Sequence, residues 1–218
     1  MTSDINTGEL LLHKKNQSYV STLIAILVLV GMLVFFYFFS FIPIQGESME
    51  NTIYDKQYCF SLRKGYTVNR GDIVIIDLSD GGENHDIVKR VIGISGDKII
   101  FMRGADNNTV ELYLCKKGES SFKKVNEPYL KETMRYVPTI FYQTPVLSFD
   151  PKLTDYDFDK YDPNIDPNVY KEIDSKTVII PNGSVFFLGD NRNVSRDSRY
   201  YGTQPLNKIK YKVLSVIY

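Results

Sequence analysis

The sequence predicts a mainly β protein, with a single N-terminal transmembrane helix followed by an antiparallel β-sheet or barrel-like body that carries an accessory loop or lobe. Three observations support this. A long apolar run without charged residues lies near the N-terminus, and short runs rich in β-branched residues dominate the rest. After residue 45 no stretch keeps the period of an amphipathic helix.

Residues 19–44 are predicted to form the transmembrane anchor. No Asp, Glu, Lys or Arg occurs between Lys15 and Glu47, and residues 23–44 are almost wholly apolar. As a helix, that run would span roughly 30 Å, the hydrocarbon thickness of a bilayer. A cleavable secretory signal is the alternative, but the run exceeds the usual apolar core of about 7–15 residues and no small-x-small site follows it.

The charges that flank the apolar run predict its orientation. Lys14 and Lys15 precede it, whereas Glu47 and Glu50 follow it. By the positive-inside rule, residues 1–18 form a cytoplasmic tail and residues 45–218 lie on the other side of the membrane.

Strands are predicted wherever a short β-branched run is bounded by turn residues, and Gly-Asp pairs stand beside several of them. An aromatic content of 13% suits such a body. The predicted strands cover residues 72–78, 86–94, 98–102, 110–115, 177–180, 184–188 and 210–217.

Residues 147–175 differ from the rest of the exported part, because acidic residues outnumber lysines and three prolines interrupt any regular element. This segment is predicted to be a solvated loop or small accessory lobe. Its alternating aspartates resemble the start of a calcium-binding loop, but Lys160 stands where that loop needs glycine, so metal binding is not expected.

Composition and charge narrow the function classes. Lys+Arg and Asp+Glu each number 26, so no net charge favours a nucleic-acid partner. The two cysteines, Cys59 and Cys115, are too few for a disulfide framework. Two buried free thiols are favoured over one bridge, since nothing in the sequence brings the pair together.

Histidine is scarce, which limits the hydrolytic chemistry available. The chain has two histidines, His13 in the tail and His85, so a Ser-His-Asp triad would rest on His85 alone. Lysine is the alternative base, provided that burial lowers the pKa of its amine. Lys89 lies in an apolar strand, on the face of Ile87 and Val91. Without further information, a lysine in such a strand is expected to lie on its solvent-exposed face.

Ser48 lies four residues after the predicted end of the anchor, within roughly 14 Å of the bilayer edge. A nucleophile at this place would act on substrates presented at the membrane surface. Taken alone, Ser48 would be an N-cap or linker serine.

Five ordered segments behind the anchor resemble those of the type I signal peptidases, the bacterial Ser/Lys leader peptidases of peptidase family S26. The nucleophile segment is residues 46–53 (GESMENTI), and the last and most specific is 189–199 (GDNRNVSRDSR). Between them lie 71–74 (GDIV), 88–93 (VKRVIG) with Gly96-Asp97, and 125–130 (VNEPYL).

The resemblance implies a membrane-bound serine endopeptidase that removes N-terminal signal peptides from exported precursor proteins, cutting after small residues. It implies a single-pass protein of the bacterial cytoplasmic membrane, with its N-terminus inside, in contact with the lipid bilayer and without a metal or other cofactor. Ser48 would be the nucleophile and Lys89 its general base, with Ser195 orienting the Lys89 amine. Gly46 would lie in the oxyanion region beside the Ser48 N–H, and Asp197 would form a structural ion pair with Arg90 or Arg199.

Two residues depart from the family pattern. Asn51 stands where the family usually has proline, and Ser95 replaces a frequent proline. The loss of proline is expected to loosen the nucleophile turn without removing a reactive group. The alternative function is a signal-peptidase-like factor that assists pilus or surface-protein assembly by binding, with pilin precursors as its clients. Such relatives have lost the Ser/Lys pair, whereas this chain keeps it.

Overall fold

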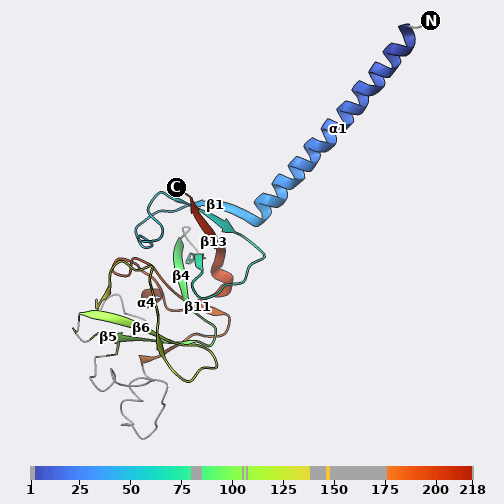
Figure 1. Cartoon of the computed structure of the whole chain (residues 1–218). Coiled ribbons are helices and arrows are strands. Elements are labelled where there is room, and N and C mark those ends of the chain that lie inside the picture. Colours follow the sequence, from blue (N-terminus) through green and yellow to red (C-terminus); the bar gives the residue numbers. More distant parts are fainter. Residues whose placement is uncertain are drawn as a thin grey trace.

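In the computed structural model a long helix projects from a β-rich body (Figure 1), and the structure describes residues 3–79, 85–104, 106, 108–137, 146–147 and 176–217. Almost all of the predicted acidic segment 147–175 lies outside these residues. Helix α1 spans Ser3–Phe38. Its part Gln17–Phe38 is long and apolar enough to cross a membrane, and none of it is buried against the body.

The apolar run predicted as one helical span is divided between two elements. The helix ends at Phe38, and Phe39–Pro43 forms strand β1, which pairs with β2 (Tyr58–Leu62) so that Phe41 opposes Phe60. A continuous apolar run has no period that separates helix from buried strand, which explains why the sequence did not show that the helix ends at Phe38. A strand therefore separates Ser48 from the helix.

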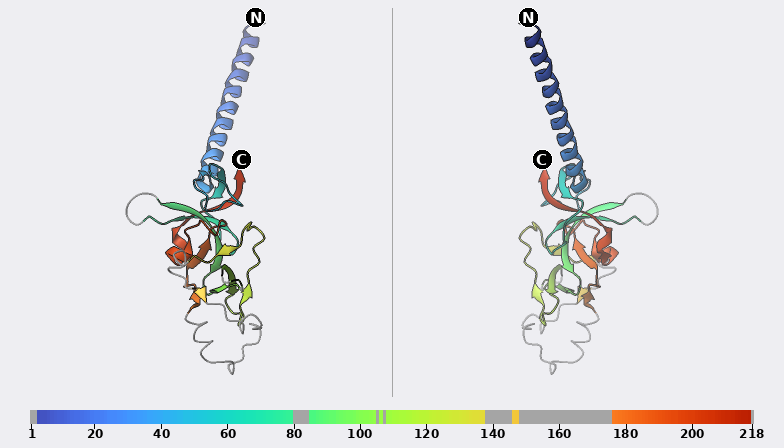
Figure 2. Two further views of the ribbon diagram at one scale, coloured as in Figure 1. Left: turned by 90° about the vertical axis from the view of Figure 1, so that its left-hand side faces the viewer. Right: turned by 90° about the vertical axis from the view of Figure 1, so that its right-hand side faces the viewer.

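Two sheets form the body. The first has seven strands in the order β1-β2-β13-β3-β4-β11-β12, all antiparallel. Views from two sides show its C-terminal strand β13 ending near the base of α1 (Figure 2). Besides β1 and β2, its strands are β3 (Ile73–Asp77), β4 (Asp86–Ile94), β11 (Ser184–Leu188), β12 (Gln204–Pro205) and β13 (Ile209–Ile217).

The second sheet is built on the hairpin of β5 (Lys98–Arg103) and β6 (Thr109–Cys115). Four two-residue strands complete it, and one of them, β9, pairs in parallel with β5. Each predicted strand is present within about a residue or two at its ends. The four short strands are β7 (Lys123–Lys124), β8 (Met134–Arg135), β9 (Val146–Leu147) and β10 (Val178–Ile179).

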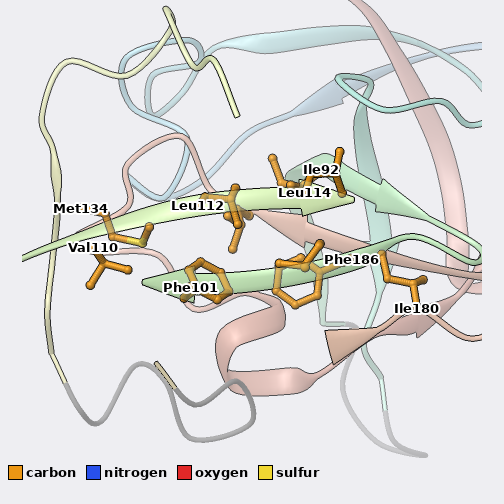
Figure 3. Close-up of a cluster of buried hydrophobic side chains, with 10 residues drawn as sticks. Ile92, Phe101, Val110, Leu112, Leu114, Met134, Ile180 and Phe186 are labelled. Atoms are coloured by element: carbon orange, nitrogen blue, oxygen red, sulfur yellow. The ribbon is translucent and has the colours of Figure 1, made fainter. Parts of the chain in front are cut away.

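The main hydrophobic core lies where the second sheet packs against β4 and β11, around Phe101 and Phe186 (Figure 3). Gly93 of β4 permits this packing, because a side chain there would collide with Ile180 and crowd Ile99. A second cluster, with Ile44, Met49, Ile53, Cys59, Ile75 and Val88, underlies the turn that carries Ser48. Cys59 and Cys115 are both buried and unbonded, as the sequence favoured.

Asp97 connects the loops around the junction of the two sheets. Its buried carboxylate accepts two hydrogen bonds of 2.6 Å from Arg70, and others from the backbone N–H groups of Ile94 and Lys117. Burial alone would raise the pKa of Asp97, but these donors outweigh it and hold the pKa below its ordinary value.

Replacing this carboxylate should weaken the fold in a pH-dependent way. We expect Asp97→Asn to reduce the free energy of unfolding by about 2–4 kcal/mol at pH 7, because Arg70 loses its charged partner. The pKa of Asp97 is depressed in the folded state, so its contribution is complete at pH 7, well above the ordinary Asp pKa of about 3.9, and is lost as the pH falls through the lowered pKa. Denaturant unfolding in detergent at pH 7 and in acid measures this. Glu132→Gln, at a largely exposed ion pair with Arg135, is the control and should change little.

Candidate active site

Ser48 and Lys89 come together from two different elements. Ser48 lies in the turn that follows β1, and Lys89 lies in β4, opposite Val74 of β3. The Lys89 Nζ is 2.6 Å from Ser48 Oγ and 2.8 Å from the Val88 carbonyl oxygen. Lys89 is only 2% exposed, so it does not occupy the wet face of its strand. His85, the other base considered, is an exposed residue just before β4.

Burial sets the proton affinity of the Lys89 amine. Removal from water is the largest influence and lowers its pKa from 10.5 to about 8. The nearby carboxylates of Asp197 and Asp190 act in the opposite direction, whereas the Arg199 guanidinium lowers the pKa further. An amine with this pKa is partly neutral near pH 7 and can accept a proton from the Ser48 hydroxyl.

Ser195 lies near the Ser48 backbone, since both border Gly189. Its hydroxyl is buried close to the Asp197 carboxylate, whose pKa it helps to lower, and within the described ranges it makes no hydrogen bond to Lys89. The role of Ser195 in orienting the amine stays a prediction.

Asp197 pairs with Arg199, one of the two partners that the resemblance allowed. The ion pair is 2.7 Å long and both side chains are fully buried. Asp197 also caps the short helix α4 (Ser198–Tyr201) and accepts the Gly189 N–H. Burial would raise the pKa of Asp197, but Arg199 and these donors keep it below its usual range.

Arg90 pairs with Asp190. Two hydrogen bonds, of 2.9 and 2.6 Å, join the guanidinium to that carboxylate, and the Tyr129 ring lies 4.0 Å from the guanidinium carbon. Sequence reasoning missed Tyr129 and also the buried ion pair of Arg192 with Glu127. Both Tyr129 and Glu127 lie in the segment 125–130, so its resemblance to the family was the sequence feature that could have pointed to them.

The segment 189–191 holds the nucleophile turn. Asn191 donates its backbone N–H to the Ser48 carbonyl oxygen and its side-chain amide to the Glu47 carbonyl oxygen. The approach is so close that a Cβ on Gly189 would collide with the Ser48 carbonyl oxygen and with Ser195. The position of Ser48 therefore depends on a glycine in this segment.

The backbone N–H of Ser48 is available in the oxyanion region. The Ser48 N–H makes no hydrogen bond to any group in the described part of the chain. Gly46 has a φ of +93°, in the region that favours glycine. Its N–H is already donated to Asp55 Oδ1 at 2.8 Å. A second donor to an oxyanion must therefore come from elsewhere.

A small cleft adjoins Ser48 and Lys89. Its volume is about 190 Å³, and it lies between the segment after β1 and the first half of β4. Strand β11 pairs with β4 from Arg90 to Ile94, and among the described residues no strand pairs with the same edge at residues 86–89, which line the cleft. The lining is mainly aliphatic and includes Ile42, Ile44, Ile75, Ile87 and Val88.

The Gly189 contact leads to a prediction about Ser48 itself. Gly189→Ala should slow acylation of Ser48 by a small serine-directed electrophile by about 10²-fold, because the added methyl displaces the Ser48 backbone. Mass spectrometry of the labelled protein over time measures this rate. Gly31→Ala is the control, since nothing lies within 4 Å of that position. An unchanged rate in Gly189→Ala would show that the turn tolerates the displacement.

The amino-acid sequence is similar to those of known proteins. The profile of the family described as "Signal peptidase, peptidase S26" matches residues 16–218. Signal peptidase IB of Staphylococcus aureus (strain COL) is 32% identical over 173 residues, which cover 78% of this chain and 73% of the relative. Signal peptidase I of Streptococcus pneumoniae serotype 4 is 30% identical over 182 residues, covering 77% and 76%.

Among solved structures, that of a signal peptidase I from Enterococcus faecalis V583 matches 70% of this chain and 100% of its own, with 21% identity and a TM-score of 0.38. The extent of the profile match and the identity to the two curated relatives decide the assignment: the chain belongs to the signal peptidase family, peptidase S26.

Proposed function

We propose that this chain is a membrane-anchored serine endopeptidase that removes N-terminal signal peptides from exported precursor proteins. The observation that carries the proposal is the 2.6 Å contact between Ser48 Oγ and the buried Lys89 Nζ. Membership of a family of signal peptidases supplies the substrate class.

In the proposed mechanism the neutral Lys89 amine accepts the proton of the Ser48 hydroxyl as its oxygen attacks the scissile carbonyl carbon. The Ser48 N–H stabilises the resulting oxyanion. The lysine then gives the proton to the leaving amine as the peptide bond breaks, which leaves an ester on Ser48. Water, deprotonated by the same amine, hydrolyses that ester and frees the serine.

The cleft supports cleavage after small residues. An extended peptide can hydrogen-bond to the edge of β4 at residues 86–89 and add a strand there. Side chains that point into the cleft meet aliphatic walls in a volume of about 190 Å³. The aliphatic lining favours apolar side chains next to Ser48 and Lys89, in keeping with cleavage after small apolar residues.

The proposed setting is the bacterial cytoplasmic membrane, with residues 1–18 in the cytoplasm and residues 45–218 outside. The apolar exposed helix supports the anchor. The phenylalanine rings of Phe35, Phe39, Phe41 and Phe60 stack where α1 meets β1 and β2. Nearby, Lys64 Nζ lies 4.7 Å from the centre of the Tyr37 ring. Aromatic rings beside lysine are typical of a lipid headgroup region, so we place the base of the body there.

The assembly-factor alternative is less well supported. A factor that acts only by binding has no need of a desolvated lysine next to a serine, whereas this chain has both. Pilin precursors remain candidate clients of the peptidase, on the same footing as other precursors.

The Ser/Lys mechanism predicts the loss of cleavage in single variants. Ser48→Ala and Lys89→Ala should each reduce precursor cleavage by about 10³-fold or more, and the double variant should be little worse, because the two residues act as a unit. Cleavage of a precursor panel by purified protein in detergent, followed by mass spectrometry, measures this. Ser120→Ala and Lys98→Ala change exposed residues of the same types and should keep wild-type activity. Near-wild-type turnover in either site variant contradicts the mechanism.

The depressed pKa of Lys89 predicts the pH dependence. Only the neutral amine can act as the base, and with a pKa of about 8 the neutral fraction rises from about one-tenth at pH 7 to about nine-tenths at pH 9. The rate constant kcat/KM should rise with pH and level off above about pH 9. A plateau reached by about pH 5–6 would instead indicate a carboxylate or an ordinary histidine as base.

A further inference from the structure

Asn51, three residues after Ser48, has a backbone conformation that is rare for its residue type. Its φ is +105°, and among the described residues Lys56 is the other non-glycine with a positive φ. Side chains with a Cβ are strained in this region, although asparagine tolerates it better than most. Proline, with φ fixed near −65°, cannot adopt it. The nucleophile turn of this chain is therefore shaped differently from one that carries proline at this position.

The Asn51 side chain compensates for this conformation with a long-range contact. Its amide Nδ2 donates to the Asp190 carbonyl oxygen at 3.2 Å. Its neighbour Thr52 donates to the Asp190 carboxylate at 2.5 Å. The same carboxylate is held by Arg90, the residue that follows Lys89 on β4. A chain of contacts thus connects the end of the nucleophile turn to the strand that carries the proposed base.

The beginning and the end of the turn are held by the same segment. At its start, Glu47 and Ser48 accept hydrogen bonds from Asn191, and at its end Asn51 reaches Asp190. Within the turn, the N–H groups of Thr52 and Ile53 both donate to the Met49 carbonyl oxygen. Loss of the Asn51 contact would remove one of the two contacts that hold the end of the turn to Asp190, while the start stays attached. The position of Ser48 relative to Lys89 would then be less tightly fixed.

We propose that Asn51 is a positioning residue that fixes Ser48 relative to Lys89 through the Asp190 carbonyl, in the place where the family resemblance implies proline. The inference rests on the proposed Ser48/Lys89 chemistry. It replaces the expectation of a looser turn: a side-chain hydrogen bond supplies the restraint that a pyrrolidine ring supplies by fixing φ.

Two variants distinguish the effect of the Asn51 side-chain amide from the effect of its positive φ. Asn51→Gly keeps access to a positive φ and removes the amide, whereas Asn51→Asp keeps the shape but sets a carboxylate against the Asp190 carbonyl oxygen. We expect kcat for precursor cleavage to fall about tenfold in Asn51→Gly and further in Asn51→Asp. KM should stay within about twofold, because Asn51 does not line the cleft. The acylation rate of Ser48 by a small electrophile should fall in parallel.

The matched control is Lys56→Gly. Lys56 has a φ of +68° and an exposed side chain, so this change relaxes the backbone in the same way without removing a contact to Asp190. It should leave kcat and the acylation rate unchanged. The unfolding midpoint of each variant is measured alongside, and Asn51→Gly should unfold close to wild type, because the relief of strain offsets the lost hydrogen bond.

The outcomes are distinguishable from those of the proposed function. Wild-type kcat and acylation in Asn51→Gly would overturn the inference, as would full activity in Asn51→Pro, because the observed turn excludes proline. A fall in activity that matches an equal loss of folded protein would also overturn it. If the wild type neither cleaves precursors nor is acylated at Ser48, the proposed function fails and this inference fails with it.

Discussion

The burial of one lysine amine is the constraint on which the rest of the structure depends. Lys89 has to be taken out of water for its pKa to approach 8, and a strand packed on both faces achieves this. Desolvation of an ammonium is unfavourable, and within the described part of the chain the amine has two hydrogen-bond partners, the Val88 carbonyl and the Ser48 hydroxyl. The folding of the surrounding sheets must therefore compensate for a site that is intrinsically unstable in its charged form.

Three ion pairs join residues of β4, 125–130 and 189–199, and in each a guanidinium lies against one carboxylate. Arg199 pairs with Asp197, Arg90 with Asp190 and Arg192 with Glu127. The carboxylates of Asp197 and Asp190 raise the pKa of Lys89 and the Arg199 guanidinium lowers it, but desolvation remains the largest influence. Buried pairs of this kind are weak evidence for stability, but a unique pairing fixes the register of the segments that carry it. Here the segments that carry the pairs are β4, residues 125–130 and residues 189–199.

The predicted strands could be found in the sequence because they alternate or are rich in β-branched residues between turn signals, and β4 is the clearest case. The division of the apolar run at Phe38 could not be found, since both parts are equally apolar. Ser48 and Lys89 were singled out by resemblance, because a serine and a lysine far apart in sequence have no local pattern that brings them together. The pairing of Arg90 with Asp190 and the positive φ of Asn51 depend on tertiary contacts, which no local sequence pattern reveals. From the sequence, asparagine in place of proline predicted only a more flexible nucleophile turn.

The direct passage from helix α1 into strand β1 has a geometric consequence. No loop separates Phe38 from Phe39, and the ring of Phe35 stacks against Phe39 and Phe60, so the strand is a stiff continuation of the anchor. The strand then leads directly to the cleft wall and the turn with Ser48. In a bilayer the length of this strand would set the distance from the membrane at which a polypeptide is cut. A precursor would have to extend from the hydrocarbon edge over that distance before its small residue could reach the serine.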